Sequence, residues 1–168
     1  NTTQLRVMIV DDKFIPVTNT DGVNRQGLLC GVALRGVDVR SPSYTGRIHQ
    51  DAKEYAKQVA ESLEWAEITI GQFGIGEGFH TGGIIPDMPD ISESDELAEG
   101  YVINDVASVT ITPKCIEGMD IVFVNSFGES KRELVNHFLE SDACVTAEPA
   151  QALKGAKKTV LVTDVLLT

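Results

Sequence analysis

The chain has 168 residues, a hydrophobic fraction of 42% and a formal net charge of −11 at pH 7. This acidic balance excludes ordinary binding to nucleic acid, which needs a basic face, and no unbroken apolar run is long enough to cross a membrane. The length predicts a single α/β domain over residues 1–168, either whole or as an excerpt or subunit of a longer protein.

The three cysteines, Cys30, Cys115 and Cys144, are far apart in the sequence. No pair has the spacing of a zinc site, and an odd number of distant cysteines argues against a disulfide scaffold. Cys30 and Cys144 stand in apolar, strand-like runs and are predicted to be small buried side chains. Free cysteines of this kind indicate a reducing compartment, so we expect a cytoplasmic protein.

The N-terminal part is predicted to be rich in β-structure. An apolar run over residues 5–10 predicts a buried strand that ends at Asp11 and Asp12. Residues 14–17 either extend this strand or pair back onto it. Residues 27–39 are apolar, then alternating, and predict one or two strands with a bend.

The clearest helix signal covers residues 50–65. Its apolar residues recur at spacings of three and four, which predicts one buried face that includes Tyr55, Val59 and Leu63. Residues 66–70 then predict a strand that leads into a glycine-rich connection.

The second half of the chain alternates strand and helix signals. The predicted elements are a helix at 93–99, an extended run at 101–112, a strand at 120–125, a helix from a capping box at 126–129 through residue 140, a strand at 143–146, a helix at 149–155 and a strand at 159–168. Such alternation favours parallel strands with helices on both faces. We therefore predict a three-layer α/β fold, with a mainly parallel sheet flanked by helices and a β-rich N-terminal part.

Acidic side chains follow the first predicted strand. In open α/β sheets ligands bind at the carboxyl ends of the strands, and Asp11 and Asp12 stand at such an end. They are candidates for acid–base catalysis or for binding a divalent cation, although the cofactor itself is left unknown. The alternative is that they only solvate the end of a strand.

The segment 71–90 contains six glycines and one histidine. Gly74, Gly76 and Gly78 are candidate ligand-binding residues because glycines let a phosphate approach backbone N–H groups. His80 is a candidate catalytic base. Glycines and prolines break the helix that a Rossmann cofactor site requires, so that site is excluded. A mobile lid and a plain exposed connection remain open alternatives.

Ser126 directly follows a predicted buried strand. Its hydroxyl and the first free N–H groups of the next helix make it a candidate anion-binding residue. A role as the helix N-cap alone also explains it.

These residues predict an enzyme or enzyme subunit that binds a small polar or anionic ligand at the carboxyl ends of the strands. The alternative is a non-catalytic interaction subunit that assembles with another chain, as a homo-oligomer or with a partner subunit. Clustering of Asp11, Asp12, His80 and Ser126 around one pocket would favour the enzyme.

Overall fold

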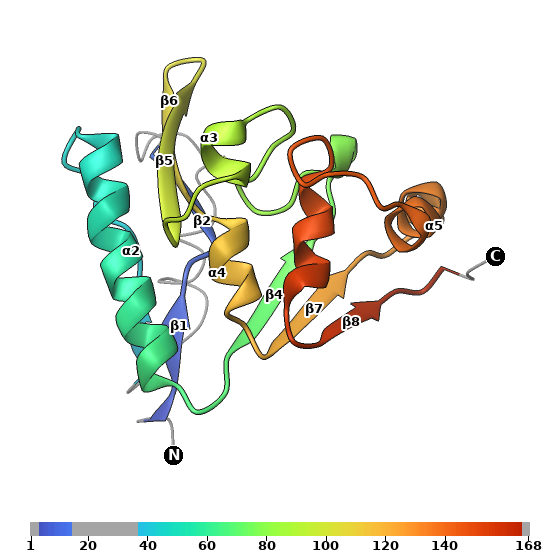
Figure 1. The fold of residues 1–168 in the computed structure, drawn as a ribbon, viewed down its shortest axis with the longest axis horizontal. Helices are drawn as coiled ribbons and strands as arrows, with labels where there is room; N and C mark the ends of the chain where they lie inside the picture. The colour runs from blue at the N-terminus through green and yellow to red at the C-terminus, as the bar shows by residue number, and fades with distance from the viewer. Residues whose placement is uncertain (1–3, 15–36, 166–168) are drawn as a thin grey trace.

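The computed structural model describes residues 4–14 and 37–165, which form three small sheets with helices packed on them (Figure 1). In chain order the strands are β1 (Arg6–Met8), β2 (Asp11–Phe14), β3 (Asp38–Arg40), β4 (Ile70–Gly74), β5 (Ala98–Ile103), β6 (Val106–Ile111), β7 (Ile121–Asn125) and β8 (Thr159–Val162). The helices are α2 (Ile48–Trp65), α3 (Pro89–Ser92), α4 (Pro113–Glu117) and α5 (Arg132–Glu140), with 3₁₀ turns η2 (Glu77–Phe79), η3 (Glu129–Lys131) and η4 (Pro149–Gly155). The predicted three-layer α/β class is confirmed.

The parallel sheet has the strand order β4-β7-β8, and its strands run in register from Ile70↔Ile121 to Gly74↔Asn125. Its amino end is closed by Asp120. One oxygen of that carboxylate accepts hydrogen bonds from the Thr69 amide at 2.8 Å and the Thr69 hydroxyl at 2.9 Å, and the other accepts from Lys157 Nζ at 2.7 Å. One carboxylate thus fastens together the starts of all three strands.

The second sheet is antiparallel, in the order β2-β6-β5. β5 and β6 form a hairpin whose turn residues Asn104 and Asp105 have φ of 50° and 61°, the left-handed conformation that short hairpin turns require. The extended run predicted at 101–112 is therefore two strands. β1 and β3 make a separate parallel pair.

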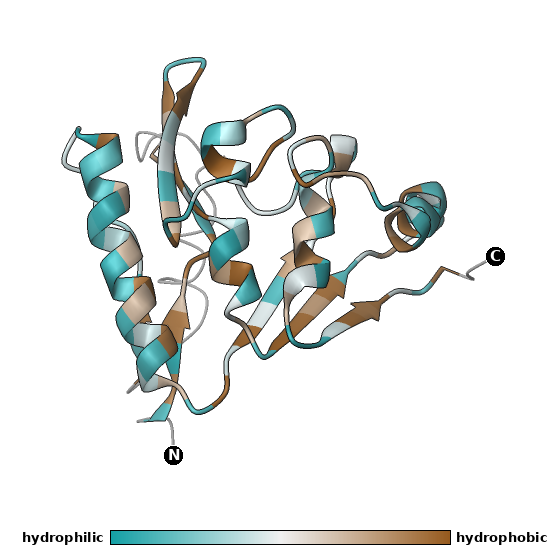
Figure 2. Ribbon diagram, in the orientation of Figure 1, coloured by the Kyte–Doolittle hydropathy of each residue, from teal (hydrophilic) through white to brown (hydrophobic). Residues whose placement is uncertain are grey.

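Helix α2 lies against β5 and β6, and its outer face is largely hydrophilic (Figure 2). Tyr55 and Val59 are buried as predicted, whereas Leu63 is only half-buried because it borders a cavity. The Tyr55 hydroxyl donates to the Ile9 carbonyl at 2.6 Å, which ties the helix to the chain just before Asp11.

Several predicted boundaries are wrong. Asp11 and Asp12 begin β2 rather than ending a strand, and the strand expected at 66–70 runs over Ile70–Gly74 instead. The helix expected at 93–99 does not form, because α3 ends at Ser92, a turn and bends follow, and β5 starts at Ala98; α4 was missed. Residues 143–146 form no strand, since residues 143 and 144 are irregular and a turn covers residues 145–147, and Cys144 is exposed.

Other predictions lie partly or wholly outside the described residues. Cys30 and most of the expected strands at 14–17 and 27–39 belong to this group, as do the last residues of the strand expected at 159–168. Within the described ranges no helix combines the length and the hydropathy needed to cross a bilayer.

Candidate functional site

A cavity of ≈ 370 Å³ lies where β4 ends and where β1 leads into β2. Its lining comprises Val10 and Asp11, residues 72–76, His80 and Gly82. The volume is within the range of small-molecule sites. Of the residues predicted from the sequence, the structure thus brings together Asp11, His80, Gly74 and Gly76 in one place.

His80 lies directly against the backbone of Gly76. A Cβ built at Gly76 would overlap the imidazole ring, and the Gly76 amide donates to the His80 carbonyl at 2.9 Å. His80 Nδ1 lies 2.8 Å from the Glu77 carbonyl oxygen. Because a carbonyl only accepts, the proton sits on Nδ1, which leaves the Nε2 lone pair free to take a proton from a ligand.

Asp11 is the carboxylate of this cavity. Burial raises its pKa above the ordinary value, while the nearby charges of Lys13 and His80 oppose that rise. Side chains alternate along β2, so Asp12 points to the opposite face from Asp11 and Lys13. Asp12 is 5% exposed, beside Tyr55, and does not line the cavity.

The glycine-rich segment is folded rather than a plain loop. Its first residues belong to β4, and the Thr81 hydroxyl donates to the Gly74 carbonyl at 2.9 Å. Gly83 N donates to the Thr110 hydroxyl at 3.2 Å, which anchors the segment to the antiparallel sheet. A Cβ on Gly82 would approach Val10 Cγ1 to 2.8 Å, so glycine allows the segment to pack against the connection between β1 and β2.

The carboxyl ends of β4, β7 and β8 lie side by side in the parallel sheet, and the glycine-rich segment continues from the end of β4. There the Gly128 amide donates to Asp164 at 2.7 Å, and Lys131 Nζ donates to the Ile75 carbonyl at 3.4 Å. Lys131 was missed by the sequence analysis. In the sequence, the feature that could have identified it is a lysine three residues after Gly128, in the glycine turn that follows the predicted strand. In the structure this lysine lies near Ile75, which lines the cavity.

Ser126 is not a helix cap. Helix α5 starts only at Arg132, after η3, and its N-cap Lys131 makes no side-chain cap. The Ser126 hydroxyl is buried and has no hydrogen-bond partner among the residues that the structure describes. It directly follows β7 but does not line the cavity, and Gly78 does not line it either.

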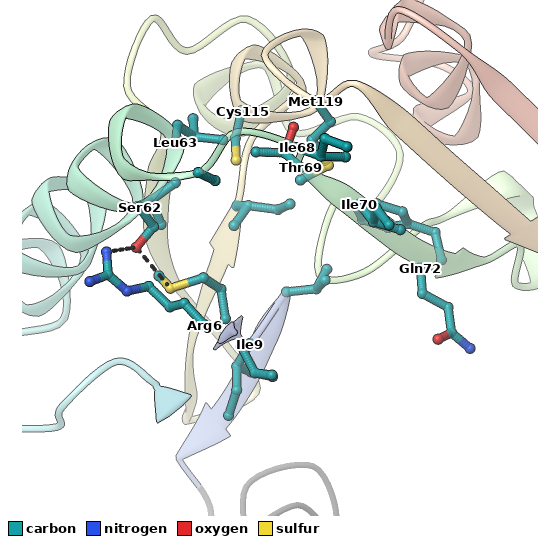
Figure 3. A pocket seen from close by; sticks show the side chains of 18 of the residues that line it. Arg6, Ile9, Ser62, Leu63, Ile68, Thr69, Ile70, Gln72, Cys115 and Met119 are labelled. Carbon is teal, nitrogen blue, oxygen red and sulfur yellow. Dashed lines mark hydrogen bonds between the residues drawn. The ribbon is translucent and has the colours of Figure 1, made fainter. Parts of the chain in front are cut away.

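A larger cavity of ≈ 960 Å³ adjoins the first and lies between β1, α2 and β4 (Figure 3). Arg6 and Ser62 of this lining are engaged with other protein groups, since Arg6 donates to Ser62 at 3.1 Å, pairs with Asp38 at 2.7 Å and lies over the Trp65 ring. Cys115 lines it, but burial raises the pKa of that thiol to about 12, so it remains protonated. Asp11 lines both cavities, whereas His80 lines only the smaller one, so the smaller cavity is where the two groups meet.

A divalent cation finds no ready-made site in residues 4–14 and 37–165. These ranges contain no group of three histidine, cysteine, aspartate or glutamate side chains placed to hold a metal ion.

Solved structures with this fold come from several organisms. The chain is 17% identical to a 6-phosphogluconolactonase from Shewanella baltica OS155, with a TM-score of 0.75 over 97% of this chain and 73% of that one. The 6-phosphogluconolactonase from Thermotoga maritima is 16% identical, with a TM-score of 0.75 over 96% and 73%. A monomeric glucosamine-6-phosphate deaminase is 18% identical, with a TM-score of 0.70 over 94% and 71%.

No curated protein sequence matches the chain. The family model described as glucosamine-6-phosphate isomerases/6-phosphogluconolactonase matches residues 1–162, nearly the whole length. The chain therefore belongs to the glucosamine-6-phosphate isomerase/6-phosphogluconolactonase family.

Proposed function

We propose that the chain binds a phosphorylated sugar in the smaller cavity and hydrolyses its lactone, with His80 as the general base. The main support is the position of the His80 ring, which lies against the Gly76 backbone. Its Nδ1–H is hydrogen-bonded to the Glu77 carbonyl, so Nε2 is available to accept a proton. The family and the named activities of the structural relatives support a phosphosugar ligand.

The reaction needs one base and one acid. His80 Nε2 takes a proton from water, and the resulting hydroxide attacks the lactone carbonyl carbon. The tetrahedral intermediate collapses by breaking the bond to the ring oxygen, which takes the proton back from the imidazolium. Asp11, close enough to His80 for their charges to interact, stabilises the imidazolium while it exists.

The phosphate requires positive charge in a chain whose net charge is −11. We place it near Lys131, which reaches the cavity wall at Ile75, with Lys13 as a second cation near Asp11. Gly78 and Ser126 stay sequence-based proposals for ligand contacts, but neither lines the cavity and the Ser126 hydroxyl is buried, so the proposed phosphate site does not depend on them. Asp12 has a structural role in this proposal, since it faces away from the cavity.

Two substrates test the proposal. Purified protein is assayed with 6-phosphogluconolactone, by acid release, and with glucosamine 6-phosphate, by ammonia release. We expect lactone hydrolysis that His80→Gln lowers at least about 100-fold, because a positioned base contributes 10²–10⁴-fold. His49→Gln, on the exposed start of α2, is the matched control. Turnover of neither substrate, with no rise in Tm on adding either product, would refute the proposal.

A second function, assembly with another chain, is favoured by one surface feature. Ile68, just before β4, and Ile70, its first residue, are 65% and 63% exposed beside the larger cavity. We propose this face as a contact in a homo-oligomer or with a partner subunit of a cytoplasmic enzyme. Light scattering of wild type and Ile70→Glu tests it, and a monomer in both cases contradicts the homo-oligomer.

A further inference from the structure

Phe79, the residue before His80, has an unusual backbone conformation. Its φ is 60°, directly after Gly78 at φ 67°. The left-handed region is uncommon for a bulky side chain and costs free energy, so other contacts must hold the residue there. A left-handed turn at this point sets the direction in which the next side chain, His80, leaves the backbone.

Phe79 packs against the hydrophobic core and also contacts helix α5. The ring of Phe79 packs on the ring of His137, with 4.6 Å between centroids and 43° between planes. His137 Nε2 donates in turn to Glu148 at 2.7 Å, and the second oxygen of Glu148 accepts from Ser141 at 2.8 Å and Gln151 at 3.0 Å. Three donors therefore fix the carboxylate that anchors the imidazole of His137.

The same part of the chain supports the glycine-rich segment on both sides of Phe79. Before it, Lys131 Nζ donates to the Ile75 carbonyl at 3.4 Å. After it, the Asp87 amide donates to the Thr146 carbonyl at 2.8 Å. Both flanks are thus fastened to η3 before α5 or to the turns that follow α5, and the Phe79–His137 contact bears directly on the turn between them.

We infer that Phe79 and His137 are positioning residues for the reaction, and that Glu148 anchors them. They keep the turn at residues 77–79 in the shape that brings the Glu77 carbonyl to His80 Nδ1 and seats the ring on Gly76. This inference rests on the proposed role of His80 as the base. Neither Phe79 nor His137 lines the cavity, so both act through His80.

The test combines kinetics with the NMR signals of the His80 ring. In Phe79→Ala we expect kcat for the lactone to fall about 10- to 100-fold with little change in KM, because a misplaced catalytic group loses its alignment. Phe79→Tyr keeps the ring and should restore wild-type kcat. Leu139→Ala, on an exposed part of α5, is the matched control and should leave kcat unchanged.

The ring nitrogens of His80 give a readout that does not depend on turnover. In wild type the ¹⁵N shifts should report a proton on Nδ1, and in Phe79→Ala the two tautomers should mix as the bond to Glu77 is lost. His137→Phe keeps a ring against Phe79 but removes the bond to Glu148, and should give an intermediate change. Unaltered His80 shifts in folded Phe79→Ala would overturn the inference, whereas an inactive wild type with Nδ1 protonated would overturn only the proposed function.

Discussion

Gly76 is required by the space that His80 fills rather than by an unusual backbone angle. Its φ is −94°, which any residue can adopt, yet a Cβ would overlap the imidazole. We expect Gly76→Ala to lower kcat by about 100-fold or more, since displacing a catalytic base by about 1 Å can cost that much. Steady-state kinetics measure it, with unfolding by urea as the companion experiment.

Gly155→Ala is the control for that variant. A Cβ at Gly155 meets the Glu117 side chain at 3.4 Å, an ordinary contact, and the residue lies at the end of η4. Its kcat should equal that of wild type. A fully active Gly76→Ala enzyme would show that His80 is not seated on Gly76 during catalysis.

Asp11 should lower stability while it serves the reaction. Burial raises the pKa of its carboxyl in the folded state, so the folded protein is most favoured below the unfolded pKa and loses stability as the pH rises through the folded pKa. We expect Asp11→Asn to raise Tm at pH 7 and to lower kcat. The gain in Tm should shrink as the pH falls toward 4, and a gain that does not depend on pH would contradict this account.

The three parallel strands depend on Asp120 at their amino ends. Lys157 and the two donors of Thr69 hold the pKa of this carboxyl at about 2. A lowered carboxyl pKa stabilises the fold above the unfolded value near 4, and that contribution disappears as the pH falls through the folded pKa. Asp120→Asn should therefore lower stability to urea at pH 7 but have little effect near pH 2.

Asp95→Asn provides the comparison for the Asp120 variant. Asp95 is exposed in the connection between α3 and β5, so its substitution should change the urea midpoint little at either pH. Equal losses in both variants would mean that charge number, rather than the contacts at the strand starts, determines the effect.

The sequence predicted elements well where local pattern decides them. Helix α2 follows from the spacing of its apolar residues, and β7 follows from a short apolar run. β4 was misplaced because Gly71 and Gly74 suggested a loop. A Cβ at Gly71 would lie 2.5 Å from the Phe73 ring and 2.6 Å from Met119 Sδ, so that glycine reflects tertiary packing that sequence spacing does not reveal.

For the candidate site, too, the sequence identified residue types but not the contacts that depend on tertiary packing. Asp11 and His80 were selected as acid–base residue types, and the structure brings them to one cavity. The capping pattern at Ser126 failed because Gly128 turns the chain at φ 94° and donates to Asp164, far along the sequence. The position of Lys131 depends on the same turn and therefore could not be predicted from the sequence either.

The net charge of the whole molecule should affect how readily it binds an anionic substrate. A net charge of −11 repels a phosphosugar at long range, whereas Lys131 and Lys13 act only nearby. Salt screens the distant charges first, since the Debye length falls from about 30 Å at 0.01 M to about 8 Å at 0.15 M. We expect KM to fall severalfold over that range of sodium chloride, and a rise in KM would mean that the local cations dominate.

The parallel sheet separates two tasks along its length. His80 and Lys131, proposed for the reaction and for the phosphate, follow the carboxyl ends of β4 and β7, whereas Asp120 fastens the amino ends, about 16 Å away at about 3.3 Å per residue. Changes at one end are too distant to alter packing at the other. Substitutions at the carboxyl ends of the strands can therefore change substrate preference, and substitutions at the amino ends can change thermal stability, as two independent traits.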